Sequence, residues 1–466
     1  MTSLAEPIHI TALATELTGP LLTPGTPDYE EEVAAFNTAV THQPALVVGA
    51  ADAADVQAAI RYAAAHNLPV GVQATGHGAI EAIAVGVLIS TRRLDQLAID
   101  PGRRTATVGA GVRWRAVIDA AAPYGLAPLN GSSSDVSAVG YTLGGGLPVM
   151  GRTFGFAADR VQSFEVVTPD ATLRHVDANS DPELFWALCG GKGNLGIVTA
   201  MTIELVPVAT VYGGGIFYPA AHIPAVLHAY PDWCATLPER TSTSIAVLRL
   251  PPAPEIPEPI RGQTVAHLRV CHLGDRVEGE RLVAPMRAAA PALVDYLADM
   301  AYTAVDSIHQ DPDHPVPFCQ RGTLLHQLTG ETIDALLAVC GPHVPAPLMV
   351  CELRHMGGAL RHGPAGGNAG GGRDAAYSLL AVGLLTPDTA EIAPCAVDAV
   401  ITAVEPWSNG HTLVNLHGTI GDEADRARAW DTATYQRLAD LSRQVDPYSL
   451  LRHGHIIGRQ HPPAQQ

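Results

Sequence analysis

Hydrophobic positions in the first half of the chain alternate between strand-like and helix-like spacing. An apolar run over Ala45–Val48 is followed by residues 52–67, in which Val56 and Ile60 lie at helical spacing, and then by a second apolar run over Val70–Gln73. This order predicts a strand, a helix and a strand, that is, a βαβ unit. The pattern then predicts strands over residues 86–91, 97–100, 105–109, 164–168, 172–177 and 197–206, with helices over Trp114–Tyr124 and Asp181–Leu188.

The character of the chain changes at Pro207. Between residues 207 and 429, strand-like runs alternate with helix-like segments, which predicts one antiparallel sheet with helices on its outer side. A last helix is expected over Trp430–Val445, because Asp446-Pro447 follows it. The strands expected in this half are Ser244–Leu250, Thr264–His272, Leu348–Leu353, Tyr377–Gly383, Thr412–His417 and His455–Gly458.

Composition and charge exclude several classes of function. The 466 residues are 47% hydrophobic and 16% charged, which excludes disorder, and the formal charge of −18 argues against nucleic-acid binding because no basic cluster compensates it. No apolar run is long enough to cross a bilayer, and the N-terminus does not resemble a secretory signal. Seven scattered cysteines without a CxxC pair indicate reduced thiols. We therefore expect a cytoplasmic protein, monomeric or a small homo-oligomer, with no membrane partner.

Two familiar cofactor motifs are excluded by their context. Residues 191–196 match the dinucleotide pattern GxGxxG, but a predicted helix precedes them and a predicted strand follows, the reverse of the Rossmann order. No GxxxxGK[ST] sequence is present, which excludes a P-loop. Two histidine pairs, His309 with His314 and His453 with His455, have loose metal-like spacing but no convergent carboxylate, so we expect no metal site.

The stretch Val72–Gly78 is a better candidate for a cofactor-binding loop than these two motifs. It places a Gly-His-Gly turn directly after a predicted strand, where successive backbone N–H groups can cradle a pyrophosphate without a basic residue. A tight turn with an incidental histidine is the alternative for this stretch taken alone.

Seven segments together resemble the FAD-binding proteins of the vanillyl-alcohol-oxidase and cresol-methylhydroxylase type, and within them the berberine-bridge-enzyme-like oxidases. They cover roughly residues 40–210 and 430–457, in matching order. The most specific of them is Asp181–Thr199, with the sequence DPELFWALCGGKGNLGIVT. The others are Pro44–Val48 with the helix after it, Val72–Gly78, Gly140–Gly146, Gly155–Val161, Val166–Asp170 and Asp446–Arg452.

The resemblance implies an α+β fold with two domains. A two-part FAD-binding domain, with a βαβ-type N-terminal part and a second α+β part, would span residues 1–206 and be completed by residues 430–466. Residues 207–429 would form an inserted substrate domain, built on an antiparallel sheet flanked by helices and covering the isoalloxazine.

The resemblance also implies how FAD is held. His77 falls at the histidine that many relatives bond to the flavin 8α-methyl group, whereas Ser133 stands where many have a second, cysteinyl link. A single covalent link through His77 is therefore expected; a histidine beside unlinked FAD is the alternative. Trp186 is expected in the core rather than on the cofactor. The expected FAD-binding residues are Ala74, Thr75, Gly76, His77, Gly78, Ala79, Ser132, Ser133, Val136, Gly140, Tyr141, Gly144, Gly145, Gly193, Asn194, Gly196, Ile197 and Val198.

The sequence identifies the general base less clearly than it identifies the FAD-binding residues. Many bacterial relatives use a tyrosine before the C-terminal helix, where this chain has Trp430 and Asp431. Asn415 and His417 are both candidate catalytic residues, because they lie two residues apart on a predicted strand and would share one face. The unperturbed histidine pKa of about 6.5 suits a base. We rank His417 first as catalytic residue, Tyr377 second and Asp431 third, because Asp431 would cap the last helix. Glu352 and Arg354 also alternate onto one strand face, although a purely structural hydrogen-bonding role stays open for all these strand residues.

The resemblance implies an FAD-dependent oxidase that uses O2 while dehydrogenating a small or medium natural-product-like alcohol, hemiacetal, amine or activated C–H, with or without ring formation. Such chemistry is typical of secondary metabolism. A flavoprotein dehydrogenase with another electron acceptor and an FAD protein with a non-redox function are the alternatives.

Overall fold

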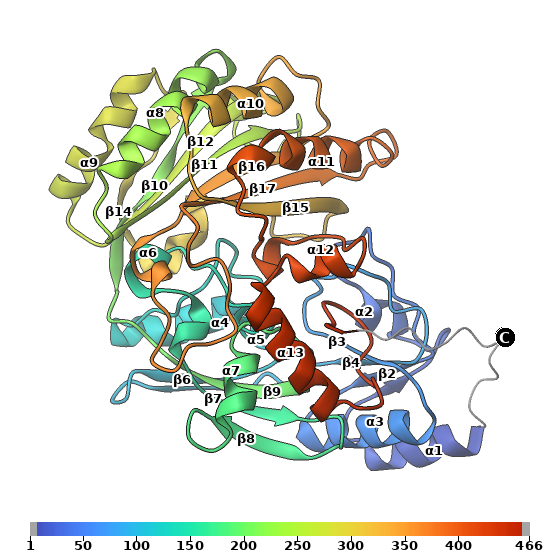
Figure 1. The fold of residues 1–466 in the computed structure, drawn as a ribbon. Coiled ribbons are helices and arrows are strands. Elements are labelled where there is room, and N and C mark those ends of the chain that lie inside the picture. Colours follow the sequence, from blue (N-terminus) through green and yellow to red (C-terminus); the bar gives the residue numbers. More distant parts are fainter. Residues whose placement is uncertain (1–6, 459–466) are drawn as a thin grey trace.

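The computed structural model describes residues 7–458, with side chains from residue 10. The N-terminal part is a small sheet covered by helices (Figure 1). Strands β2, β4 and β3 are parallel, and β1 adds to β2 in antiparallel orientation, in the order β1-β2-β4-β3. The predicted βαβ unit is confirmed, with β4 lying between its two strands. The elements are α1 (Pro7–Glu16), β1 (Leu21–Leu22), α2 (Tyr29–Val33), β2 (Leu46–Gly49), α3 (Ala53–Ala65), β3 (Val70–Gln73) and β4 (Val87–Ser90).

A second, antiparallel sheet of five strands follows, in the order β5-β6-β9-β7-β8. Its core also contains the last helix, through Leu438 and Leu441, so the C-terminal segment returns to this part of the molecule. The elements are β5 (Leu97–Asp100), β6 (Thr105–Gly109), α4 (Trp114–Ala121), α5 (Ala138–Thr142), α6 (Gly151–Phe154), β7 (Val161–Val167), β8 (Leu173–Asp177), α7 (Pro182–Leu188), β9 (Ile197–Glu204), α12 (Glu423–Ala427) and α13 (Thr432–Val445).

The middle of the chain forms one antiparallel sheet, as predicted, in the order β13-β10-β12-β11-β16-β17-β15, with β14 also paired to β10. Helices α8 to α11 cover its outer face, and the other face turns toward the first two sheets (Figure 1). The elements are β10 (Thr210–Pro219), α8 (Ile223–Ala235), β11 (Thr241–Arg249), β12 (Thr264–His272), α9 (Arg276–Ala289), β13 (Val294–Asp295), β14 (Ala298–Ala301), β15 (Phe318–Leu325), α10 (Gly330–Cys340), β16 (Val350–His355), β17 (Tyr377–Leu384) and α11 (Ala393–Ala403).

Side-chain alternation along this sheet separates its two faces. Ile245, Leu268, Leu353 and Leu379 are buried against the helices, which is the hydrophobic core of this part. Their neighbours along the strands, including Arg269, Glu352 and Leu380, line a cavity on the opposite face. Because strand residues alternate between faces, the sheet supplies a core on one side and a binding wall on the other.

Two strand predictions are wrong. Residues 412–417 contain a single 3-10 turn, Val414–Leu416, and residues 455–458 form no strand. Isolated bridges to β15 lie on either side of the first segment, where Ser408 pairs with Leu325 and Gly418 pairs with Arg321. The change of sheet after β9 is the basis on which we propose the domain bounds 1–206, 207–429 and 430–466.

Candidate functional site

One large cavity lies between the inner face of the third sheet and the loops of the first two. The glycine-rich segments around residues 74–79, 131–147 and 190–198 all contribute to its wall, as do β16, β17 and residues 413–416. The glycine-rich segments that contain the expected FAD-binding residues therefore meet in one cleft. All the expected FAD-binding residues line the cavity except Asn194.

Asn194 serves the protein itself. Its side chain is buried; Nδ2 donates to the carbonyl of Gly191 at 2.6 Å, and Oδ1 accepts from the backbone N–H of Ile457 at 2.6 Å. Both ends of the amide are thus used within the protein, where they hold the C-terminal segment to the 190–196 loop, and the expected cofactor contact of Asn194 stays a prediction.

The turn after β3 has the geometry of an anion cradle. Gly76 has a φ of 73°, and a Cβ there would lie 2.6 Å from the Ala35 backbone, so only glycine fits. Within the described chain, the backbone N–H groups of Gly76, His77 and Gly78 donate no hydrogen bond. Successive free N–H groups at such a turn suit a pyrophosphate.

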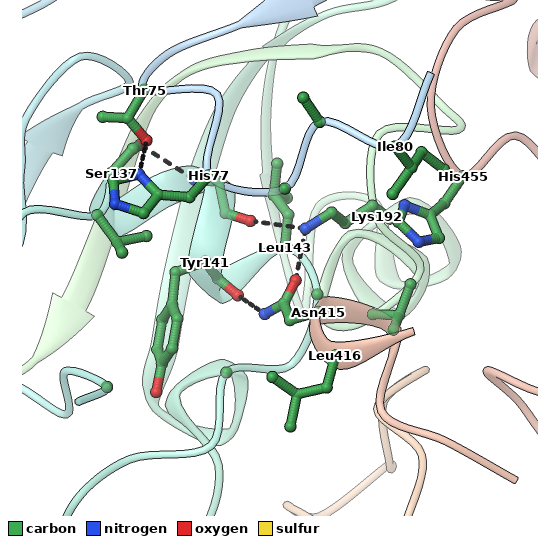
Figure 2. A pocket seen from close by; sticks show the side chains of 18 of the residues that line it. Thr75, His77, Ile80, Ser137, Tyr141, Leu143, Lys192, Asn415, Leu416 and His455 are labelled. Atoms are coloured by element: carbon green, nitrogen blue, oxygen red, sulfur yellow. Dashed lines mark hydrogen bonds between the residues drawn. The ribbon is translucent and has the colours of Figure 1, made fainter. Parts of the chain in front are cut away.

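His77 presents a free ring nitrogen at this turn. Its ring stacks on Phe36 with centroids 3.7 Å apart, and Nδ1 lies 2.9 Å from the Thr75 hydroxyl (Figure 2). Nε2 is buried and has no hydrogen-bond partner. Burial lowers the pKa of His77 to about 4, so the imidazole is neutral at neutral pH. Ser133 lines the same cavity, whereas no cysteine among the described residues does.

A lysine that the sequence pattern did not single out lines the cavity. Lys192 has a φ of 64°, and its Nζ donates to the Gly140 carbonyl at 3.2 Å and to Asn415 Oδ1 at 2.5 Å. Asn415 in turn donates from Nδ2 to the Tyr141 carbonyl at 2.8 Å, which completes the network in Figure 2. Burial lowers the pKa of Lys192 to about 8.

The three other predicted catalytic residues do not line the cavity. His417 is buried with Nε2 2.8 Å from the carbonyl oxygen of Asp425, because the 3-10 turn sends Asn415 and His417 in different directions. Tyr377 lies in the core under α8, where burial raises its pKa. Asp431 caps α13 by accepting the Thr434 N–H at 2.9 Å. The positions of these residues contradict the prediction that one of them is the base.

We expect Tyr377→Phe to leave the rate of anaerobic flavin reduction within about threefold of wild type, well short of the 10²-fold or larger loss caused by removal of a general base. The phenol is turned into the core, so the cavity is unchanged. Stopped-flow absorbance measures the rate, and a 10²-fold fall would restore Tyr377 as a catalytic residue.

Asp431→Ala should lower the free energy of unfolding by about 1 kcal/mol, the usual value of an N-cap, without changing activity. Urea denaturation followed by circular dichroism checks this, with exposed Asp440→Ala in the same helix as the comparison. A change in flavin reduction without a change in stability would contradict the capping role.

Charged side chains gather on the sheet face of the cavity. Glu352 accepts from Arg269 Nη1 at 2.6 Å and from Arg354 Nε at 2.8 Å, and all three residues line the cavity. The predicted common face of Glu352 and Arg354 is confirmed. Trp186 is buried, as expected for a core residue.

Two kinds of feature are absent from residues 7–458. No helix there is long and apolar enough to cross a membrane. No group of three or more His, Cys, Asp or Glu side chains there could hold a metal ion.

Comparison with known proteins agrees with this site. The FAD binding domain family matches residues 44–177. The FAD-linked oxidoreductase aurO of Gibberella zeae is 23% identical over 96% of this chain and 89% of its own. The structure of 6-hydroxy-D-nicotine oxidase from Arthrobacter nicotinovorans has a TM-score of 0.82 at 21% identity, covering 98% of this chain and 99% of that one. Physcomitrella patens BBE-like 1 has a TM-score of 0.83 at 19% identity, covering 97% and 100%. The chain is thus an FAD-dependent oxidoreductase with an FAD binding domain, and its fold is similar to the folds of 6-hydroxy-D-nicotine oxidase and BBE-like 1.

Proposed function

We propose that this protein is an FAD-dependent oxidase that dehydrogenates a small or medium natural-product-like alcohol, hemiacetal, amine or activated C–H and passes the electrons to O2. The observation that carries the proposal is the cavity itself, which has cofactor loops on one wall and charged side chains of the sheet on the other. With FAD held by the loops, the sheet wall would face the organic substrate.

The residues present fit FAD. The N–H groups of residues 76–78 would hold the pyrophosphate, and the unpaired Nε2 of His77 would be free to bond the flavin 8α-methyl group. When bound, the flavin supplies the hydride acceptor. Ser133 has a hydroxyl where a thiol would be needed for a second link, so we propose one link, through His77 only.

We propose that Lys192 accepts the substrate proton. Its half-buried side chain lines the cavity, where Asn415 accepts a hydrogen bond from the ammonium. Asn415 is then a positioning residue, because Lys192 and the Tyr141 carbonyl use both ends of its amide.

The proposed base predicts a pH dependence. Lysine accepts a proton only when neutral, so flavin reduction should accelerate as pH rises through about 8, the pKa of Lys192. Lys192→Met should remove this step from the pH profile, whereas Lys192→Arg should shift it beyond the measured range. Loss of bound FAD in Lys192→Met, with an unchanged pH profile in the remaining holoenzyme, would instead assign the ammonium to the cofactor phosphates.

Oxidase function can be tested without knowing the substrate. Holoenzyme reduced by light or dithionite is mixed with O2 in a stopped-flow instrument, and flavin absorbance follows reoxidation. Fast reoxidation by O2 is expected. Slow reoxidation by O2 with rapid reoxidation by a quinone would identify a dehydrogenase, and a substrate converted without a mass change of two hydrogens would identify a non-redox function.

We also propose a cytoplasmic location and a function in secondary metabolism. All seven cysteines are free in the structure, as expected in a reducing compartment. Sedimentation analysis would distinguish the proposed monomer from a small homo-oligomer.

A further inference from the structure

The sheet face of the cavity carries two arginines and one carboxylate in a fixed arrangement. Arg269 on β12 pairs in register with Ser244 on β11, and Ser244 pairs with Arg354 on β16, so the two arginines lie in one row, two strands apart. Glu352 lies in the next row, opposite Ala246. The small side chains of β11 leave room for Arg269 to reach across to Glu352.

This cluster is not electrically neutral. Two guanidinium groups share the one Glu352 carboxylate, which leaves a net charge of +1. His309, with Nε2 3.9 Å from Glu352 Oε1, is neutral because burial and the nearby arginines lower its pKa to about 3. Asp311 also lines the cavity, where its negative charge acts on Arg354, but it is exposed and forms no ion pair within 4 Å among the described residues, so it remains accessible to solvent.

Arg354 is the arginine that opens to the cavity. Its side chain is 17% exposed, against 4% for Arg269. Nε is used by Glu352, and Nη2 lies 3.5 Å from the Ser132 hydroxyl on the loop beside Ser133. Within the described chain, Nη1 donates no hydrogen bond. A guanidinium with free donors in a largely apolar cavity favours a planar oxyanion, which it can bind through two parallel hydrogen bonds.

We propose that Arg354 forms a carboxylate-binding subsite, so that the substrates of this enzyme are organic acids or bear a carboxylate. Glu352 orients the guanidinium of Arg354 through its hydrogen bond to Nε, and Arg269 neutralises the charge of Glu352. The contact of Arg354 with Ser132 places the subsite beside the loop that would border the flavin. The substrate class rests on the proposed function, because it assumes that the second molecule in the cavity is the reductant of the flavin.

Titration calorimetry of the oxidised holoenzyme with benzoate and with its neutral isostere benzamide tests the subsite. We expect benzoate to bind roughly 10- to 100-fold more tightly, the usual worth of a hydrogen bond to a desolvated charge. Arg354→Met should reduce benzoate affinity to that of benzamide and leave benzamide unchanged. Arg281→Met removes the same charge at a side chain that is 71% exposed, and should preserve the preference.

Arg354→Lys covers the case in which the methionine variant does not fold. It should retain a smaller preference for benzoate, because an ammonium cannot form the bidentate contact. Equal affinity of the wild type for the two probes, or no measurable benzoate binding, would overturn the proposal. A preference retained in Arg354→Met, with a shifted flavin spectrum before ligand is added, would also overturn it and assign Arg354 to the flavin. Calorimetry needs no turnover, so an enzyme that fails the O2 test can still show the carboxylate preference.

Discussion

His77→Ala should release all FAD into the supernatant on acid precipitation, whereas the wild-type pellet should stay yellow. His77 lines the cavity at the turn after β3, its imidazole is neutral at neutral pH, and Nε2 has no hydrogen-bond partner that would compete with a covalent bond. With alanine at this position no nucleophilic nitrogen remains at the turn, so the cofactor is held by noncovalent contacts that acid disrupts. Absorbance of both fractions at the flavin band measures the outcome.

Matched variants identify the linking residue. Ser133→Ala should keep the flavin in the pellet, because the hydroxyl forms no link, and the exposed His175→Ala should behave like wild type. In the His77→Ala background, Ser133→Cys should restore some acid-stable flavin, since a thiolate is a far better nucleophile than a hydroxyl. Free flavin in the acid supernatant of the wild type would show that His77 only packs beside the cofactor.

The sequence alone predicts much of the sheet structure because local signals determine it. Residues 70–73, 97–100, 105–109 and 264–272 are strands with the predicted bounds. Each is an apolar or β-branched run bounded by Gly, Pro or charged turn residues, so its neighbours along the chain suffice to define it. The cofactor loops are predictable for the same reason, since their glycines are close together in sequence.

In residues 412–417, the spacing of hydrophobic residues wrongly predicted a strand. Leu413 and Val414 are adjacent and both buried, which a one-sided strand does not allow. Gly410 and Gly418 have φ angles of 82°, and between them the chain leaves β15 to place Asn415 in the cavity. This shape depends on residues distant in sequence, such as Tyr141, whose carbonyl accepts from Asn415.

The cluster of Arg269, Glu352 and Arg354 on the sheet face of the cavity could be predicted only in part, because it also depends on contacts between residues distant in sequence. The alternation of Glu352 and Arg354 is visible in the sequence, but Arg269 is 83 residues away from Glu352 and reaches it only because β11 separates β12 from β16. Lys192 occupies a variable position of the glycine-rich motif at residues 191–196, so the motif does not single it out, and its partner Asn415 is 223 residues away. Pairings of this kind follow from sheet order and domain packing, which local patterns do not encode.

Glu352→Leu should lower the free energy of unfolding by about 3–5 kcal/mol, the usual cost of leaving a buried charge without its partner. Arg269 and Glu352 have side chains 4% and 2% exposed, so water cannot replace the lost carboxylate. Urea denaturation followed by circular dichroism measures the change. Glu280→Leu, which breaks the exposed Arg276–Glu280 pair, is the matched control and should cost about 0–1 kcal/mol.

The same pair predicts how stability depends on pH. Burial alone would raise the pKa of Glu352, but the guanidinium groups of Arg354 and Arg269 outweigh it and hold that pKa well below its ordinary value. A depressed carboxyl pKa gives stability that is complete above the unfolded value of about 4.3 and is lost as pH falls below it. Wild type should therefore lose more stability than Glu352→Gln between pH 7 and pH 3.5, because the variant has no such carboxylate to protonate. The proposed stabilisation would be contradicted by equal losses of unfolding free energy in wild type and Glu352→Gln, or by a loss below about 1 kcal/mol in Glu352→Leu. Either result would show that Glu352 is not needed to stabilise the two buried arginines. The orientation of Arg354 toward the cavity would then need another cause.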